Sequence, residues 1–303
     1  MKSLARELLR TYLSRCPITE GKGPLYRTLA ARLLPEEHEV AVELPPGFRM
    51  ALDLGQAMQR EIYYFGTYER KESVLVRRLL RPGDAVWDVG ANIGYYALLA
   101  AACVGPEGRV VAFEPFPAAG ARLQENVRLN GFAQVRCVQA AVTDTDGRAT
   151  LFHDGAHPDG VASLLRTGQG LREVQCATVS LDRFRQDSGE RPPLLVKVDV
   201  EGAEMAVLAG AAGLLSGTEA PMLLVEMEDS HVSWRGASRA DIQNLMVGWG
   251  FAGFHREGRR WRRCPDVRRV RQRNLFWMKP GDRLHRERCR EAGIADQELS
   301  AGS

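Results

Sequence analysis

Short runs of β-branched residues alternate with stretches of helical periodicity through residues 85–278. This alternation is typical of βαβ units, in which a largely parallel sheet carries helices on both faces. In chain order, the pattern predicts strands at 85–89, 109–114, 134–142, 194–200 and 221–228, with helices at 92–103, 117–130 and 202–215. After a helix at 239–250, closing antiparallel strands are predicted from FAGFHR, RRWRRC and NLFWM. We therefore expect a doubly wound α/β fold.

Three segments depart from this rhythm. Residues 143–180 contain a DTDG turn, several glycines and two short strand-like pieces, so we expect an inserted hairpin and loop that helps to select the substrate. Residues 1–60 predict helices and a short hairpin, and residues 281–303 predict a loose polar tail. The main domain is accordingly expected at 61–280.

Composition narrows the class of protein. The chain has 303 residues, of which 45% are hydrophobic and 26% charged, and these values exclude disordered, collagen-like and coiled-coil proteins. The longest mostly apolar run, at about 95–104, is far shorter than the roughly 20 residues of a membrane span, so we expect no transmembrane segment. The N-terminus lacks the pattern of a signal peptide, and the six cysteines form no CxxC pair. We therefore expect a cytoplasmic protein with reduced thiols.

The positive charge is local. The net charge is only +3, yet nine arginines lie between Arg256 and Arg273, with Trp261 among them. Such a stretch is either a solvated face or a surface that attracts phosphates, acidic sugars or a membrane. A basic groove with a stacking aromatic would fit nucleic acid, although the sequence shows no appended RNA-binding module and no NPPY-type motif.

The sharpest motif lies where the first predicted strand meets the first predicted helix. Asp88, Gly90 and Gly94 occupy this turn, and Glu114 follows at the end of the second strand. Glycines at a strand-to-helix turn let the backbone approach a ligand closely, and an acid on the second strand is placed to accept hydrogen bonds from ribose hydroxyls. The alternative interpretation is a glycine-rich turn that precedes a core helix and binds no ligand.

The same motif favours S-adenosylmethionine over a dinucleotide. A dinucleotide turn of the GxGxxG type presents NH groups to a pyrophosphate, whereas this loop has two glycines and a carboxylate at Asp88. A buried carboxylate would repel phosphate but suits a ligand with a sulfonium or an ammonium group.

Three motifs in this order resemble the FkbM-type methyltransferases, class I enzymes that use S-adenosylmethionine. They are DVGANIGYYALLAA, AFEPFPAAGARLQENVRLNG and LLVKVDVEGAEMAVLAGA, and the resemblance spans about residues 61–278. It implies a Rossmann-like sheet of seven strands, with the last strand antiparallel, here preceded by the helical and hairpin extension. It also implies methyl transfer to an oxygen of a sugar, a glycan or another small molecule.

The resemblance also implies a set of cofactor contacts. The residues that would hold the methionine part are Asp88, Gly90, Asn92 and Gly94, with Tyr68 and Glu69 at its end. Glu114 would bind the ribose, and Phe116 would lie against the adenine with Ala141 behind it. Phe116 is equally interpretable as a core aromatic at a helix start, and Tyr68 and Glu69 as the first residues before a helix.

A second cluster, of charged residues, lies at the end of the predicted strand 194–200. Strand alternation would place Lys197, Asp199 and Glu201 on one side and the intervening valines on the other. Three charged residues at the carboxyl end of a central strand are costly to bury without partners, so we expect them to serve catalysis, with a self-satisfied ion-pair network as the alternative.

Methyl transfer to a hydroxyl needs an aligned acceptor and a route for its proton. One solution is a general base: Lys197 with a pKa lowered by burial, His231, or a carboxylate. The other is a divalent metal such as Mg²⁺, held by Asp199 with Glu226, Glu228 or Asp229. We favour the base, because the sequence shows no tight pair of aspartates.

Two other functions are alternatives to methylation of a small molecule or glycan. A nucleic-acid methyltransferase would use the arginine-rich stretch, and a non-catalytic protein could retain the cofactor fold. The N-terminal helix, with Leu4, Leu8, Leu9 and Leu13 at helical spacing among basic residues, could pack on the domain, join a second copy in a homo-oligomer or bind a membrane surface.

Overall fold

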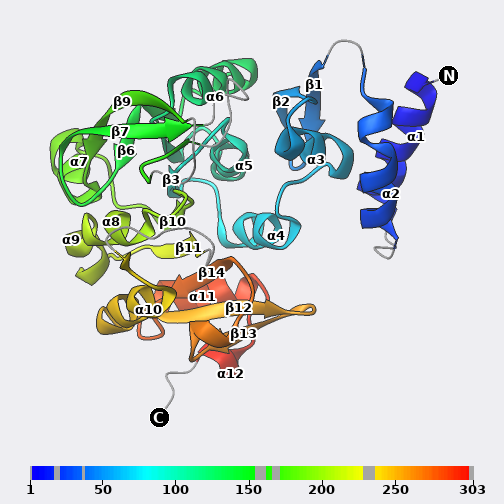
Figure 1. Cartoon of the computed structure of the whole chain (residues 1–303). Helices are drawn as coiled ribbons and strands as arrows, with labels where there is room; N and C mark the ends of the chain where they lie inside the picture. Colours follow the sequence, from blue (N-terminus) through cyan, green and yellow to red (C-terminus); the bar gives the residue numbers. More distant parts are fainter. Residues whose placement is uncertain are drawn as a thin grey trace.

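The computed structural model describes residues 2–16, 21–35, 38–153, 162–165, 171–227 and 236–299. Its centre is an eight-stranded sheet in the order β13-β12-β14-β11-β10-β3-β4-β5 (Figure 1). The strands are β13 (Arg260–Cys264), β12 (Ala252–Glu257), β14 (Asn274–Met278), β11 (Met222–Glu226), β10 (Leu195–Val198), β3 (Ala85–Val89), β4 (Arg109–Phe113) and β5 (Val135–Val138).

The strand directions confirm the Rossmann-like methyltransferase fold. The strands from β5 to β11 are parallel, and β14 lies antiparallel between β11 and β12. Without β13, this is the expected set of seven strands with the last one antiparallel. The eighth strand, β13, extends the edge because it folds back on β12 as a hairpin.

Both faces of the central sheet are buried. Trp87 and Val89 of β3 pack with the helices α7 (Leu181–Ser188), α8 (Glu204–Ala209), α9 (Ala212–Ser216) and α10 (Arg239–Gly248) on one face. Val86 packs on the opposite face with α4 (Arg70–Leu79) and α5 (Tyr95–Val104). Because both faces are covered by helices, the central strands are apolar at nearly every position.

Two predicted elements are divided. The predicted strand at 134–142 continues beyond β5 as β6 (Ala140–Val142), which leaves the central sheet. It pairs instead with β9 (Arg172–Val179), in a second sheet that also contains β7 (Gly147–His153) and β8 (Ala162–Ser163). The predicted helix at 202–215 breaks at Gly210, where a Cβ would lie 2.1 Å from the carbonyl oxygen of Thr143.

The N-terminal extension packs onto the main domain. It comprises α1 (Lys2–Arg15), α2 (Lys22–Leu29), η1 (Ala31–Leu33), β1 (Glu39–Leu44), β2 (Phe48–Asp53) and α3 (Ala57–Phe65) (Figure 1). The amide of Ala51 in β2 donates to the side-chain oxygen of Asn126 in α6 (Pro117–Asn130). Leu9 and Leu13 are buried on α1, which packs against α3 and η1, whereas Leu4 and Leu8 are exposed.

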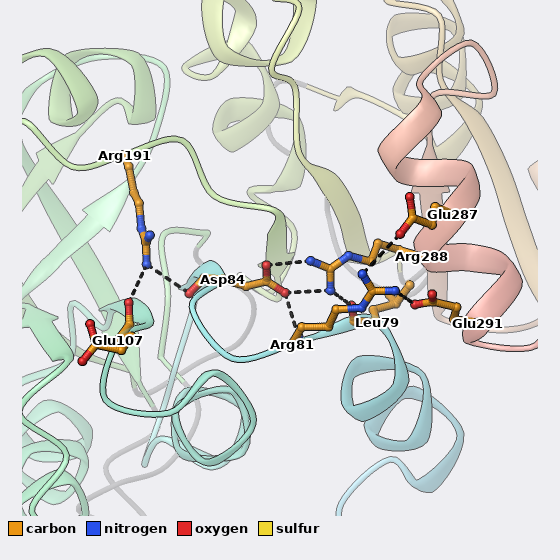
Figure 2. A network of polar contacts seen from close by, with 8 residues as sticks. All are labelled: Leu79, Arg81, Asp84, Glu107, Arg191, Glu287, Arg288 and Glu291. Carbon is orange, nitrogen blue, oxygen red and sulfur yellow. Dashed lines mark hydrogen bonds and ion pairs between the residues drawn. The ribbon is translucent and has the colours of Figure 1, made fainter.

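The C-terminal segment is not a loose tail. It forms α11 (Arg283–Glu291) and α12 (Asp296–Leu299). Figure 2 shows Arg288 facing Asp84, and its guanidinium donates to the two carboxylate oxygens at 2.8 and 3.0 Å. Arg288 also donates to the carbonyl oxygen of Leu79 at 3.0 Å. Polar composition concealed this packing, because the charged side chains are used as internal partners.

Candidate active site

The glycine turn after β3 is fixed by close backbone contacts. The NH groups of Gly90 and Ala91 both donate to the carbonyl oxygen of Phe113 at the end of β4. Gly90 has a φ of 81°, and a Cβ at this position would lie 1.8 Å from the carbonyl oxygen of Asp199. Glycine is therefore required both by conformation and by the approach of the turn that follows β10.

One cavity opens at the carboxyl ends of β3, β4, β10 and β11. The predicted site residues that line it are Tyr68, Asp88, Gly90, Asn92, Glu114, Ala141, Lys197, Asp199, Glu201 and Glu226. The cofactor motif and the charged cluster therefore meet in one place, as expected for ligand sites at this edge of a doubly wound sheet. Glu201 reaches it from a turn rather than a strand, because β10 already ends at Val198 and Glu201 has a φ of 51°.

Two polar atoms of the turn are suited to a cationic, hydrogen-bonding ligand. Among the described residues, Asp88 Oδ2 and Asn92 Oδ1 are buried without a hydrogen-bond partner. Burial raises the pKa of Asp88 to about 7, although the charge of Lys197 opposes this shift. Buried polar atoms are rarely left unpaired, so these acceptors fit the ammonium group of S-adenosylmethionine.

Glu114 organises the adjoining part of the cavity. Its two carboxylate oxygens accept the NH groups of Asn92 and Phe116, each at 2.8 Å. Burial raises its pKa to about 7, and these two backbone hydrogen bonds oppose the shift. Each carboxylate oxygen has a second lone pair, so Glu114 can accept ribose hydroxyls while it holds the turn.

Three predicted cofactor contacts are absent from the described cavity lining. Gly94 begins α5, where a Cβ would lie 2.5 Å from Leu123 Cδ1, so its described role is helix packing. The Phe116 ring lies against His153, with 4.8 Å between ring centroids. Glu69 accepts hydrogen bonds from the Tyr96 hydroxyl and the Asn274 amide, at 2.7 and 2.5 Å. The core interpretation of Phe116 fits this placement.

Lys197 is a buried cation rather than a buried amine. Its ammonium lies 2.7 Å from Asp199 Oδ2 and 4.6 Å from the centre of the Tyr96 ring. Burial alone would lower the pKa of Lys197, but the carboxylates of Asp199, Glu69 and Asp88 outweigh it and raise the pKa above its usual value. The expected lowering of this pKa is therefore wrong, and Lys197 is unsuited to act as the base.

Glu226 and Asp199 form a hydrogen-bonded carboxyl pair at the ends of β10 and β11. Burial, together with the hydrogen bond and charge of Asp199, raises the pKa of Glu226. Burial would raise the pKa of Asp199 as well, but Lys197 holds it below its ordinary value. The two pKa values are thus shifted in opposite directions, and Asp199 is the more acidic member of the pair.

The part of the chain that the structure describes places no further metal-ligating side chain beside Asp199 and Glu226. Within those residues, no group of three or more His, Cys, Asp or Glu side chains could hold a metal ion. The candidates Glu228, Asp229 and His231 lie outside the described residues.

Sequence reasoning missed several residues of the cavity wall. Tyr96, Met58 and Arg273 line the cavity, and they come from α5, from α3 and from the segment before β14. Of these three residues, only Tyr96 could have been predicted from the sequence, because it lies two residues after the glycine turn. Met58 and Arg273 are distant in sequence and reach the cavity through tertiary packing.

The arginine-rich stretch lacks the aromatic platform that nucleic acid would use. Trp261 is 3% exposed and packs edge-on against Phe276. Arg262 pairs with Glu298, and Arg268 pairs with Asp266. The nucleic-acid alternative therefore loses its stacking residue.

Comparison with known proteins identifies the family. The family model for the methyltransferase FkbM domain matches residues 88–257, which include the cofactor turn and the charged cluster. The chain belongs to the FkbM methyltransferase family. Together with the cavity, this membership establishes a methyltransferase that depends on S-adenosylmethionine. In the described residues, no helix is long and apolar enough to cross a membrane.

Three curated relatives each match part of the chain. The 31-O-demethyl-FK506 methyltransferase of Streptomyces tacrolimicus is 35% identical, over 56% of this chain and 74% of the relative. The hexuronic acid methyltransferase of Haloferax volcanii is 33% identical, over 58% of this chain and 68% of the relative. The 2-O-methyltransferase of Sinorhizobium fredii is 29% identical, over 48% of this chain and 64% of the relative.

Proposed function

We propose that this FkbM-family methyltransferase transfers the methyl group of S-adenosylmethionine to a hydroxyl oxygen of a sugar, a glycan or another small molecule. The observation that carries the proposal is the single cavity lined by Asp88 and Glu114 on one side and by Lys197, Asp199 and Glu226 on the other. Two of the relatives are named for methylation at an oxygen, and a third is named for a hexuronic acid.

The cofactor residues have separate tasks in this proposal. Asp88 and Asn92 would bind the ammonium end through their buried oxygens, and Glu114 would bind the ribose hydroxyls. When bound, S-adenosylmethionine supplies an electrophilic methyl group on its sulfonium sulfur. Ala141 and the apolar side chain of Leu151 would enclose the adenine side of the cavity.

The charged cluster would receive the acceptor. A hydroxyl beside Asp199 gives up its proton to this carboxylate as its oxygen bonds to the methyl carbon, and the electron pair of the broken sulfur–carbon bond stays on sulfur. Lys197 fixes the orientation of Asp199 from 2.7 Å. Glu201, on the next turn, lines the same cavity and would contact the acceptor. The proton acceptor in this proposal is Asp199, and because Lys197 lowers its pKa, the proton moves only as the bond from oxygen to the methyl carbon forms.

A divalent cation at Asp199 and Glu226 is the competing way to activate the hydroxyl. It would have to share Asp199 with the ammonium of Lys197, which already neutralises that carboxylate. We therefore expect catalysis without a metal.

The test is methyl transfer from radiolabelled S-adenosylmethionine to a panel of sugars, polyols and peptides, each with and without EDTA. The proposal predicts label on a hydroxyl-bearing acceptor, in an ether that survives mild alkali, and equal rates with EDTA. Label found only on nitrogen or carboxyl groups would contradict O-methylation of a hydroxyl. A loss of rate in EDTA that Mg²⁺ restores would favour the metal.

A further inference from the structure

A second cavity adjoins the active site on the side of the N-terminal extension. It lies between α2 and α3, has a volume of about 460 Å³ and shares two lining residues, Met58 and Tyr68, with the active-site cavity. This volume is within the range of small-molecule sites. We call it the extension groove. Figure 1 shows α3 between α2 and the main domain.

Tyr68 stands at the junction of the two cavities. Its ring packs edge-on against Tyr95, with 5.9 Å between the ring centroids. Burial raises the pKa of Tyr68, and the charges of Glu69 and Asp199 raise it further. Tyr68 and Met58 line both cavities, so the extension groove and the site of Asp199 lie on either side of these two residues.

The far part of the extension groove is built around an anchored guanidinium. Arg60 Nη1 donates to the carbonyl oxygens of Leu54 and Gly55, at 2.9 and 3.4 Å. The Tyr26 hydroxyl is also hydrogen-bonded to Arg60. The Tyr26 ring is itself held against Phe65, with 5.1 Å between centroids. Arg60 is thus pre-organised, and guanidinium donors beyond those used here can meet a ligand.

A second guanidinium gives the groove its charge. Arg27, the residue after Tyr26 on α2, lines the groove and is exposed. Glu61 is the one acid among the groove's described lining residues, so the two guanidinium groups outnumber it. Paired guanidinium groups recognise planar or tetrahedral oxyanions through charge-assisted hydrogen bonds.

We propose that the extension groove binds the anionic group of an acidic sugar acceptor, through Arg27 and Arg60, while the hydroxyl to be methylated lies at Asp199. This inference rests on the proposed function and specifies its substrate class. It assigns acceptor selection to the N-terminal extension, outside the residues that the family model matches.

The test is a ligand-observed NMR titration of the full chain saturated with S-adenosylhomocysteine. The probes are methyl glucuronide, glucose 6-phosphate and the neutral methyl glucoside. We expect both anionic sugars, or one of them, to bind at least about tenfold more tightly than the glucoside, since a hydrogen bond to a charged group contributes about that factor. Whichever anion binds identifies carboxylate or phosphate as the recognised group.

Matched variants connect the preference to the groove. Arg27→Ala should abolish most of the preference for anionic sugars, because it removes one of the two guanidinium groups of the groove. Arg27 is exposed, so we expect the variant to fold normally. Arg49→Ala removes one charge from an exposed position on β2 outside the groove and should change nothing. Arg60→Lys keeps the charge but loses the planar fork, and should weaken binding of the anion.

The two proposals fail in different ways. Equal binding of charged and neutral sugars, an unchanged preference in Arg27→Ala, or no sugar binding while S-adenosylhomocysteine binds would each overturn the groove proposal alone. Failure of S-adenosylhomocysteine to bind would overturn the proposed function, and the groove proposal with it.

Discussion

The ammonium of Lys197 lies 2.7 Å from Asp199 Oδ2, at the carboxyl edge of the central sheet. Lys197 is 3% exposed and rests over the Tyr96 ring, so its position is determined by the core rather than by solvent. The charge of Lys197 and the hydrogen bond with Glu226 both lower the pKa of Asp199 and so favour its ionised form. In the proposed mechanism this carboxylate receives the proton of the acceptor hydroxyl.

Asp199→Asn should lower the turnover number by at least about a hundredfold, because general-base catalysis commonly contributes 10²–10⁴-fold. Binding of S-adenosylhomocysteine should change little, since Asp88 and Glu114 remain. Steady-state kinetics and calorimetry measure the two effects separately. Asp187→Asn, on the exposed surface of α7, is the matched control. An Asp199→Asn enzyme with the natural turnover number would remove this residue from the mechanism.

Asp88 should oppose folding at high pH in the absence of cofactor. Its pKa is about 7 in the folded chain but near 4 when unfolded, so the folded state binds more protons across this window. Its contribution to stability therefore falls as pH rises from about 4 to about 7. We expect Asp88→Asn to raise the melting temperature relative to the natural chain more at pH 8 than at pH 5, while weakening cofactor binding. Thermal melts at the two pH values would contradict this if the difference were constant.

Gly90→Ala should disable the cofactor turn. The added Cβ would meet the carbonyl oxygen of Asp199, in addition to the cost of a positive φ. Gly131→Ala is a matched control, because its φ is 64° in the ordinary left-handed region and nothing lies within 4 Å of the added Cβ. The control should cost about 1 kcal/mol. Gly90→Ala should cost clearly more in denaturant unfolding and lose affinity for S-adenosylhomocysteine. Equal effects of the two variants would show that the close approach is unimportant.

Arg288→Ala should destabilise the whole domain. Arg288 and Asp84 have side-chain exposures of 8% and 14%, and breaking a buried ion pair costs about 3–5 kcal/mol. Arg290→Ala removes an exposed arginine of the same helix that pairs with exposed Asp296, and should cost less than about 1 kcal/mol. Chemical denaturation of both variants gives the comparison. Similar values would mean that α11 is attached mainly by its apolar contacts.

The sequence predicted what depends on local patterning. The strand at 85–89 and the helix at 117–130 have the predicted bounds, because apolar runs and the caps at Pro117 and Gly131 determine them. The turn at Gly90 and the acid at Glu114 were placed in the cavity because both follow parallel strands, whose carboxyl ends share one sheet edge.

What the sequence could not supply depends on partners distant along the chain. The pKa of Lys197 was predicted in the wrong direction, because burial was considered without the carboxylates around the ammonium, which are Asp199 of the same motif and then Glu69 and Asp88 of other elements. Phe116 turns toward His153, since β7 supplies a neighbour that local pattern does not reveal. The tail likewise folds as helices because Asp84 receives Arg288.

The most direct test of the central claim is calorimetric titration of S-adenosylmethionine and S-adenosylhomocysteine into the natural chain and into Glu114→Ala. The buried carboxylate of Glu114 holds the turn at Asn92 and faces the cavity. We predict that both ligands bind the natural chain with 1:1 stoichiometry, and that Glu114→Ala weakens both by at least about tenfold while the chain remains folded by circular dichroism. Absence of binding to the natural chain, or equal affinity in the variant, would contradict the assignment of this cavity as the cofactor site.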